Sequence, residues 1–321
     1  MAVTTSPFTN ADFVATIPEI WTPIVNEPNY AKAVLSNFVT DLSPYMAEGG
    51  DIAHVPNIYT NVFTASTQST QGAEIDTQGP AQVDTTLTVS THQYVSWIIG
   101  DLTMKQLATK YQLNEAYARE AQNVLITALE GALAALWSSL TTNVVGDTAT
   151  VLTDLEIRTA INALDSTNYA LADCAFFFHP TVYWAQVGGI SKYYDFQISQ
   201  MNFIRTGNFG PMDASRGLRG HIYDIPVFVT SNIVSGLQTY RNLLLHKSAL
   251  GFAIQTMSPA SVPGGQFSQD MGASKSYIRV QSNYELRNIG TLVVCDIIYG
   301  VGVLREPGGV VIRANTTATT A

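Results

Sequence analysis

The stretch TTLTVSTHQYVSWII, from Thr85 to Ile99, alternates apolar and polar residues almost without interruption. Because successive side chains of a β-strand point to opposite faces, this pattern predicts an extended strand with one buried and one solvated face. The apolar face would carry Leu87, Val89, Val95, Trp97 and Ile99, and the polar face Thr86, Thr88, Ser90, His92 and Ser96.

A rougher strand-like segment, Asp51 to Phe63, precedes this strand, and a polar connection, Thr64 to Asp84, joins the two. Such a connection is too long for a tight turn and too polar to form a core of its own. We therefore predict a projecting β-hairpin over residues 51–100, with arms of about 40 Å at about 3.3 Å per residue. A hairpin of this kind cannot bury itself, so we expect it to lie against another molecule.

Charge is distributed unevenly along the chain. Residues 1–100 contain 9 acidic residues and one basic residue, Lys32, so this third holds nearly all of the net charge of −9. Only 13% of the 321 residues are charged, about half the usual share, which favours self-association over the alternative of a neutral-surfaced enzyme. An acidic chain lacks the basic face of a sequence-specific nucleic-acid binder, although it is compatible with a container for nucleic acid.

Helical patterns flank the predicted hairpin. Prolines punctuate the first 50 residues, which predicts an arm with short helical pieces, one of them over Tyr30 to Val39. After the hairpin, Thr103 and Gln106 have the spacing of a capping box, and apolar residues then recur every three or four positions. The segment from Leu113 to Leu140 predicts a helix about 42 Å long, at about 1.5 Å per residue.

The rest of the chain mixes helical and strand patterns, which predicts an α+β fold. A second capping box, Thr153 with Glu156, opens a helix that extends to Asp165. The other predicted elements are a buried strand Cys174–His179 with a short helix to Trp184, a surface loop Gln197–Gly217, strands Ile225–Thr230 and Asn242–His246, a helix Ser248–Gln255, and long strands Tyr277–Arg287 and Leu292–Leu304.

The sequence contains none of the motifs GxSxG, GxxxxGK[ST], GxGxxG or HExxH, so we expect no enzymatic activity, cofactor or metal. His179, at a strand end, is interpreted as a hydrogen-bonded structural residue rather than a catalytic one. Cys174 and Cys295 lie in apolar runs without CxxC spacing, which predicts buried free thiols. No apolar run approaches about 18 residues and no secretory signal is visible, so we expect no membrane association.

Several residues are candidates for contacts between subunits. Arg205, Arg216 and Arg219 surround the glycine-rich loop and favour intersubunit salt bridges over phosphate binding. If the hairpin turns near Gly72, His54 and His92 lie opposite each other as a pH-sensitive pair, because two protonated imidazoles repel; in any other register each would face solvent. The remaining candidates are Trp21 in the arm and Thr64, Gln68, Gln71, Glu74 and Gln78 in the connection.

The order of these elements resembles that of the major capsid proteins of tailed bacteriophages, as do several stretches along nearly the whole chain. They are FVATIPEIWTPIVNEP (13–28), GGDIAHVPNI (49–58), TTLTVSTHQYVSWIIGDL (85–102), AINALDSTN (160–168), FFFHPTVYWAQV (176–187), LRGHIYDIPVFVTSNI (218–233), HKSALGFAIQ (246–255) and IYGVGVLREPGGVVI (298–312). These are loose patterns rather than a catalytic signature.

The resemblance implies a division of the chain and a function. It implies an N-terminal arm (1–50), an E-loop hairpin (51–100), a P-domain with a long spine helix (101–142 and 268–300), and an α/β A-domain with a C-terminal tail (143–267 and 301–321). It further implies hexamers and pentamers in an icosahedral shell, assembled in the host cytoplasm, that encloses double-stranded DNA in the virion without reading its sequence. Scaffolding, portal and decoration proteins would be separate partners.

Two departures from the family pattern and two alternatives accompany this resemblance. Some members cross-link an E-loop lysine to a neighbouring asparagine, but no lysine lies between Lys32 and Lys105 here, so this chemistry is not expected. The chain begins almost at the arm, so we expect any scaffold to be a separate protein. The alternatives are an α/β enzyme with a dimerisation hairpin and an encapsulin-like nanocompartment shell.

Overall fold

A computed structural model of the chain describes residues 33–46, 49–57, 63, 65–67, 71–72, 74–75, 77–79, 83–102, 113–187, 218–236, 239–255, 266–270 and 277–316. Several predictions lie outside these residues. They are the arm up to residue 32, the capping box at Thr103, the loop from Gln197 to Gly217 and the tail after Asn315, apart from residue 316.

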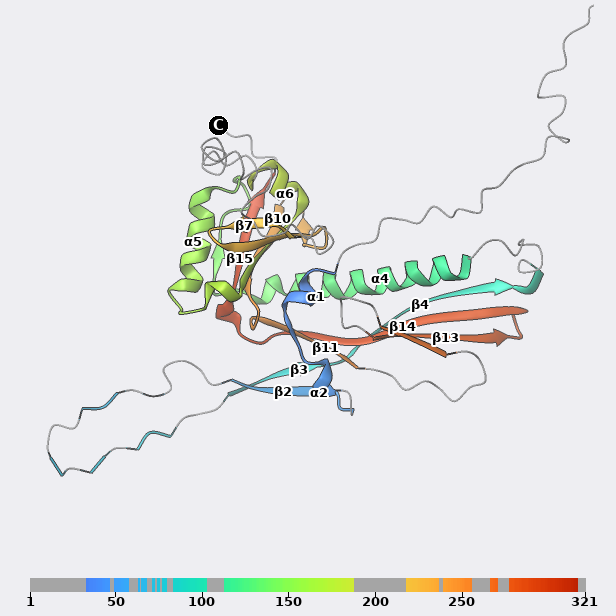
Figure 1. Ribbon diagram of the computed structural model, residues 1–321, viewed down its shortest axis with the longest axis horizontal. Coiled ribbons are helices and arrows are strands. Elements are labelled where there is room, and N and C mark those ends of the chain that lie inside the picture. Colours follow the sequence, from blue (N-terminus) through green and yellow to red (C-terminus); the bar gives the residue numbers. More distant parts are fainter. Residues whose placement is uncertain are drawn as a thin grey trace, which may run out of the picture.

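One long sheet and one long helix form the extended part of the molecule (Figure 1). The helix is α4 (Leu113–Ala135), continued by a 3₁₀ turn at Leu136–Ser139, and it packs along the sheet. The strand order is β1 (Thr40–Asp41), β11 (Leu250–Gln255), β14 (Gly290–Val303), β13 (Tyr277–Glu285) and β12 (Gln266–Asp270), with β4 (Thr91–Gly100) also paired to β14.

A second, mixed sheet forms a compact unit at one end of α4 (Figure 1). Its order is β5 (Val144–Val145), β15 (Gly309–Asn315), β10 (Thr239–His246), β6 (Cys174–Phe178), β8 (Ile225–Val229) and β7 (Leu218–Ile222), with β9 (Ser235–Gly236) on β10. Helices α5 (Asp154–Asp165) and α6 (Pro180–Ala185) contribute apolar residues to the core on one face of this sheet.

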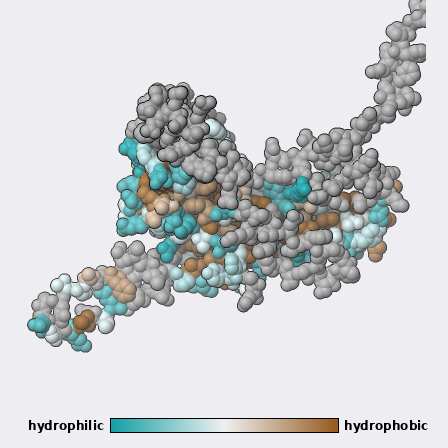
Figure 2. All heavy atoms as spheres, in the orientation of Figure 1, coloured by the Kyte–Doolittle hydropathy of each residue, from teal (hydrophilic) through white to brown (hydrophobic). Residues whose placement is uncertain are grey.

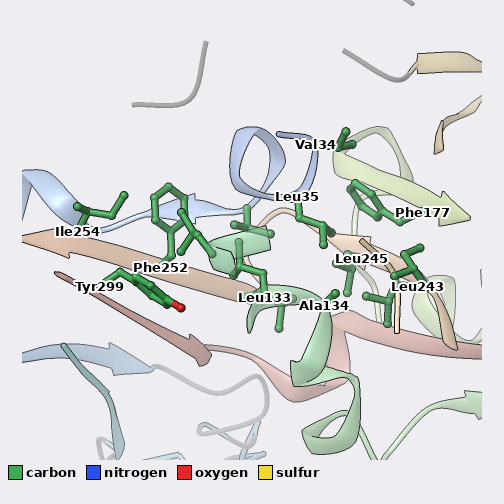
Figure 3. Packing of buried hydrophobic residues seen from close by; sticks show 14 of the residues in the cluster. Val34, Leu35, Leu133, Ala134, Phe177, Leu243, Leu245, Phe252, Ile254 and Tyr299 are labelled. Atoms are coloured by element: carbon green, nitrogen blue, oxygen red, sulfur yellow. The ribbon is translucent and has the colours of Figure 1, made fainter. Parts of the chain in front are cut away.

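The two sheets share a continuous hydrophobic core (Figure 3). Leu133 of α4 lies between Phe252 and Tyr299 of the long sheet and Leu243 of the second sheet, and all four side chains are buried. Leu35 of the short helix α1 (Leu35–Phe38) joins the same cluster. Burial of large apolar side chains from α4 and from both sheets in one cluster therefore holds the two sheets together.

Local signals predicted many elements correctly. The helix α5 begins at the Thr153–Glu156 capping box and ends at Asp165, as expected. The strand β6 with α6, the strands β8 and β10, the long pair β13–β14 and the start of α4 at Leu113 are also confirmed. The helix expected up to Leu140 changes to 3₁₀ geometry after Ala135.

One helix prediction was wrong, and a second was longer than the helix observed in the described residues. Ser248 to Gln255 was expected to be a helix, but Leu250–Gln255 is the strand β11, which pairs with β14 and β1. A short apolar run fits a buried strand and a buried helix equally well, and here the open edge of β14 decides the outcome. In the described part of Tyr30 to Val39 only the single turn α1 is helical.

The stretch from Thr85 to Ile99 also differs from its prediction. It forms two strands, β3 (Val83–Thr88) and β4, which belong to different sheets. The strand β3 pairs with β2 (Ile52–Asn57), whereas β4 pairs with β14 over its whole length, so the hairpin is shorter than the predicted 51–100. The chain crosses β14 at Gly300, where an added Cβ would lie 2.2 Å from the carbonyl oxygen of Thr88.

Candidate functional site

The β2–β3 hairpin leaves the body of the molecule from an apolar root. Leu87 and Val89 of its second arm are buried with Leu42 and Met46, the latter in the short helix α2 (Ser43–Met46). The backbone N–H of Val89 donates to the carbonyl oxygen of Asp51 at 2.7 Å, which closes the base of the hairpin. The root is therefore fixed to the long sheet, and the rest of the hairpin projects from it (Figure 1).

The connection between β2 and β3 exposes apolar side chains to solvent. All of its described residues are exposed, and Phe63 and Ile75 show 63% and 75% of their surface. Figure 2 shows apolar atoms at the surface of this projecting segment. Exposed large apolar groups on an element with no core beneath them are typical of a surface that another molecule covers.

The predicted contact residues are only partly within the described chain. Gln71, Glu74 and Gln78 are exposed in the projecting connection, and the Gln78 side-chain amide donates to the Ser66 hydroxyl at 3.5 Å. The backbone of Arg219 belongs to β7, whose partner strand is β8. Trp21, Thr64, Gln68, Arg205 and Arg216 lie outside the described residues.

The predicted pairing of His54 with His92 is wrong. His54 lies opposite Thr86, and His92 lies opposite Ile298 on another sheet, because the chain crosses over between β3 and β4. Each imidazole contacts a carboxylate instead: His54 lies 2.5 Å from Asp84, and His92 lies 2.9 Å from Asp296.

Asp296 is the centre of a charged cluster that joins three strands. Its carboxylate is buried in β14, and it accepts from Arg279 of β13 at 2.9 and 2.6 Å as well as contacting His92 of β4. Burial acts to raise the pKa of Asp296, but the bonds from Arg279 and His92 outweigh it and hold the pKa below its ordinary value. The cluster therefore fastens β4, β14 and β13 in one register.

The far end of the long sheet carries a second exposed apolar group, the tip cluster, formed by Leu102, Leu286 and Ile289. These side chains are 71%, 80% and 64% exposed, and apolar atoms gather at this end in Figure 2. The tip is fixed, because the Asp101 N–H donates to the Ile289 carbonyl oxygen at 3.0 Å and the Tyr284 hydroxyl donates to the Asp101 carboxylate at 2.7 Å. This surface was not predicted from the sequence, although Ile289, an isoleucine in a turn between two predicted strands, was an available signal.

A buried carboxylate anchors the start of the described chain to α4. Glu130 is fully buried and accepts from the backbone N–H groups of Val34, Leu35 and Ser36 at 3.2, 2.9 and 2.8 Å. Burial raises the pKa of Glu130, and these hydrogen bonds only partly oppose that effect. No local pattern indicated this contact, because the partners are more than 90 residues apart.

The two cysteines and His179 are buried or held in contacts within the fold. Burial raises the pKa of the Cys174 and Cys295 thiols to about 11, which makes both poor nucleophiles. His179 accepts from the Thr181 N–H at the start of α6 and stacks on Tyr240, and burial lowers its pKa. In the described ranges we find no cluster of three potential metal ligands and no helix long and apolar enough to cross a membrane.

The fold of this chain is similar to that of several solved structures. A chain described as Mycobacterium phage Che8 aligns with a TM-score of 0.69 and 16% identity, over 95% of this chain and 98% of that chain. The capsid of Ralstonia phage GP4 aligns with a TM-score of 0.63 and 10% identity, over 95% and 97%. The holo-SrpI encapsulin from Synechococcus elongatus PCC 7942 aligns with a TM-score of 0.60 and 11% identity, over 98% and 99%.

Comparison of the sequence itself finds no matching protein-family model and no matching curated protein. The fold alone therefore defines the class: this chain has the α+β fold of a tailed-phage capsid subunit over nearly its whole length. The expected fold class is confirmed, although identities of 10–16% leave the function to be argued from the surfaces.

Proposed function

We propose that this chain is the structural major capsid protein of a tailed phage, and that it assembles into hexamers and pentamers of an icosahedral shell enclosing double-stranded DNA. The observation that carries the proposal is the projecting β2–β3 hairpin, whose connection exposes Phe63 and Ile75 in a chain that shares its fold with capsid subunits end to end. Assembly in the host cytoplasm, with separate scaffolding, portal and decoration proteins, belongs to the same proposal.

In the proposed mechanism each subunit contributes several weak contacts rather than one strong contact. The projecting connection lies across a neighbour, and the tip cluster at Leu286 and Ile289 meets another copy. Each contact alone is weak enough for misplaced subunits to leave, whereas many simultaneous contacts stabilise the closed shell. The proposed contact residues, as expected from the sequence, are Trp21, Thr64, Gln68, Gln71, Glu74, Gln78, Arg205, Arg216 and Arg219.

The proposed division of the chain is the one expected from the sequence, with one change. The arm (1–50), the P-domain (101–142 and 268–300) and the A-domain with its tail (143–267 and 301–321) stand as proposals. The hairpin unit, proposed as 51–100, ends at β3, because β4 pairs with β14 and is part of the long sheet.

A cellular nanocompartment shell is the second candidate, because the encapsulin match covers 98% of this chain. Size-exclusion chromatography with negative-stain microscopy of the purified protein tests both shell proposals at once. Capsomers or polyhedra support a shell, whereas a compact small dimer would favour the enzyme alternative. Particles that protect DNA from nuclease identify a capsid, and particles that carry a cargo enzyme identify a nanocompartment.

A deletion tests the hairpin directly. Residues 58–82 are replaced by Asn-Gly, which joins Asn57 and Val83, the paired ends of β2 and β3, through a two-residue turn. The unassembled subunit should keep its circular dichroism and thermal unfolding, because none of the described residues of the connection belongs to a hydrophobic cluster. Shell formation should be lost; shells of normal size from this variant would remove the connection from the mechanism.

A further inference from the structure

Two arginines lie directly opposite each other in the second sheet. Arg241 of β10 and Arg313 of β15 are Cα partners in an antiparallel pair. Directly opposed residues of such a pair share one face of the sheet, with Cα atoms about 4.5–5.5 Å apart. This face is the one on which Leu243 and Val311, two residues further along, pack into the core around α4.

Neither guanidinium has an anionic partner within the part of the chain that the structure describes. Arg241 lies over the Trp137 ring at 4.9 Å, and its Nη1 and the Nε of Arg313 are buried without a hydrogen-bond partner. The nearby Asp147 carboxylate accepts from the Thr148 N–H instead. Burial and the charge of Arg313 both lower the pKa of Arg241, which reflects the same lack of a counter-charge.

The arrangement differs from that of other arginines in the fold. Arg279 and Arg158 each meet a carboxylate within 3.0 Å, on Asp296 and Asp154. Like charges placed opposite each other in a sheet repel, and half-buried charges are poorly compensated by water. Two planar guanidinium groups side by side offer several N–H donors that match an oxyanion placed between them.

The geometry points to an oxyanion site formed by Arg241 and Arg313, which a carboxylate of a second copy of this chain occupies in the assembled shell. Charge favours this occupant: the chain carries a net −9, and residues 1–100 contain 9 acids with a single base. Among the described acids of that segment, Asp51 and Glu74 are exposed and their carboxylates have no ion-pair partner. A side chain can enter a half-buried site more easily than the broad surface of a DNA duplex. The identity of the occupant rests on the proposed shell function, whereas the oxyanion site itself does not.

Thermal unfolding of unassembled subunits tests the site with inorganic phosphate as the probe. Phosphate should raise the Tm of the wild-type protein more than chloride does at equal ionic strength, and Arg313→Gln should lose this difference. In chloride alone, Arg313→Gln should have a higher Tm than the wild type, because the variant lacks the repulsion between Arg241 and Arg313. In phosphate, the wild type should have the higher Tm. Arg119→Gln, which removes an exposed arginine on α4, is the matched control and should respond to phosphate like the wild type. General stabilisation by phosphate is common to all variants and cancels in this comparison.

Assembled shells then identify the occupant. If a neighbour's carboxylate fills the site, phosphate no longer shifts the Tm of shells, and Arg313→Gln assembles less completely than Arg119→Gln. Two results would overturn the assignment of a second copy as the occupant and would indicate a phosphate group instead. In the first, phosphate still raises the Tm of wild-type shells but not of Arg313→Gln shells. In the second, shells protect bound DNA only when Arg313 is present. Wild-type subunits without a specific phosphate response would overturn the site altogether. Subunits that respond to phosphate but form no shells under any condition would refute the proposed function and leave the site standing.

Discussion

Replacement of Glu130 by glutamine tests how the chain before α1 is attached to α4. The wild-type carboxylate accepts three backbone N–H groups at 2.8–3.2 Å in a fully buried position. Glutamine keeps one acceptor oxygen and places an NH₂ donor where the second oxygen was. At least one buried N–H of Val34, Leu35 or Ser36 then loses its acceptor, and a buried group left unsatisfied costs about 1–3 kcal/mol.

The free energy of unfolding of the unassembled subunit, measured in urea, should therefore fall by about 1–3 kcal/mol in Glu130→Gln. Glu74→Gln, which changes an exposed glutamate of the projecting connection, is the matched control and should change stability by less than about 0.5 kcal/mol. Limited proteolysis should detect faster cleavage near residues 33–36 only in Glu130→Gln. Equal stability of the two variants would refute the proposed role of the carboxylate.

The difference in stability between the wild type and Glu130→Gln should depend on pH. Because the pKa of Glu130 is raised in the folded state, the folded protein binds this proton more tightly than the unfolded chain does. The stabilisation that comes from this tighter proton binding is fully present below the ordinary glutamate pKa. It is lost as pH rises through the pKa that Glu130 has in the folded protein. The deficit of Glu130→Gln should thus be largest in acid and shrink as pH rises; a deficit that grows with pH would contradict this reasoning.

Three further predictions follow from other parts of the fold. Leu286→Ser with Ile289→Ser should leave subunit unfolding unchanged and abolish shells in negative-stain images, because both side chains are largely exposed. Arg279→Met should lower the free energy of unfolding by about 3 kcal/mol, since it leaves the buried Asp296 carboxylate with His92 alone. Acid unfolding of this variant should also occur at higher pH, because the lowered pKa of Asp296 stabilises the wild-type fold at pH values above that pKa. Gly300→Ala should prevent a soluble, cooperatively unfolding subunit, because the new methyl group would lie 2.2 Å from a backbone oxygen; a normal melting curve would show that the crossing can open.

Elements marked by local signals were predictable. The Thr153–Glu156 capping box sets the start of α5 through bonds between residues three apart, so the four-residue pattern is sufficient. The alternation in β4 placed Val95 and Trp97 on the covered face and Ser96 on the exposed face, as observed. These features depend on backbone geometry that a few neighbouring residues define.

Features that depend on pairing between distant segments were not predictable. The apolar run that begins at Leu250 has no periodicity that separates a strand from a helix. It forms a strand because it pairs with the edge of β14, about 50 residues away along the chain. The register of His54 depends on where the chain crosses β14, not on its own sequence context. The tip cluster, the Glu130 anchor and the arginine pair likewise unite residues whose separation along the chain hides their contact.

The amino-acid sequence alone determined the α+β class, the long helix, the projecting polar connection and the uneven charge, because each of these is a property of consecutive residues and their periodicity. Only the tertiary structure decided that β3 and β4 enter different sheets, that α4 shares one core with both sheets, and that Arg241 faces Arg313. The reason is physical: side-chain periodicity defines which face of a strand is buried, but the partner strand is selected by the packing of the whole core.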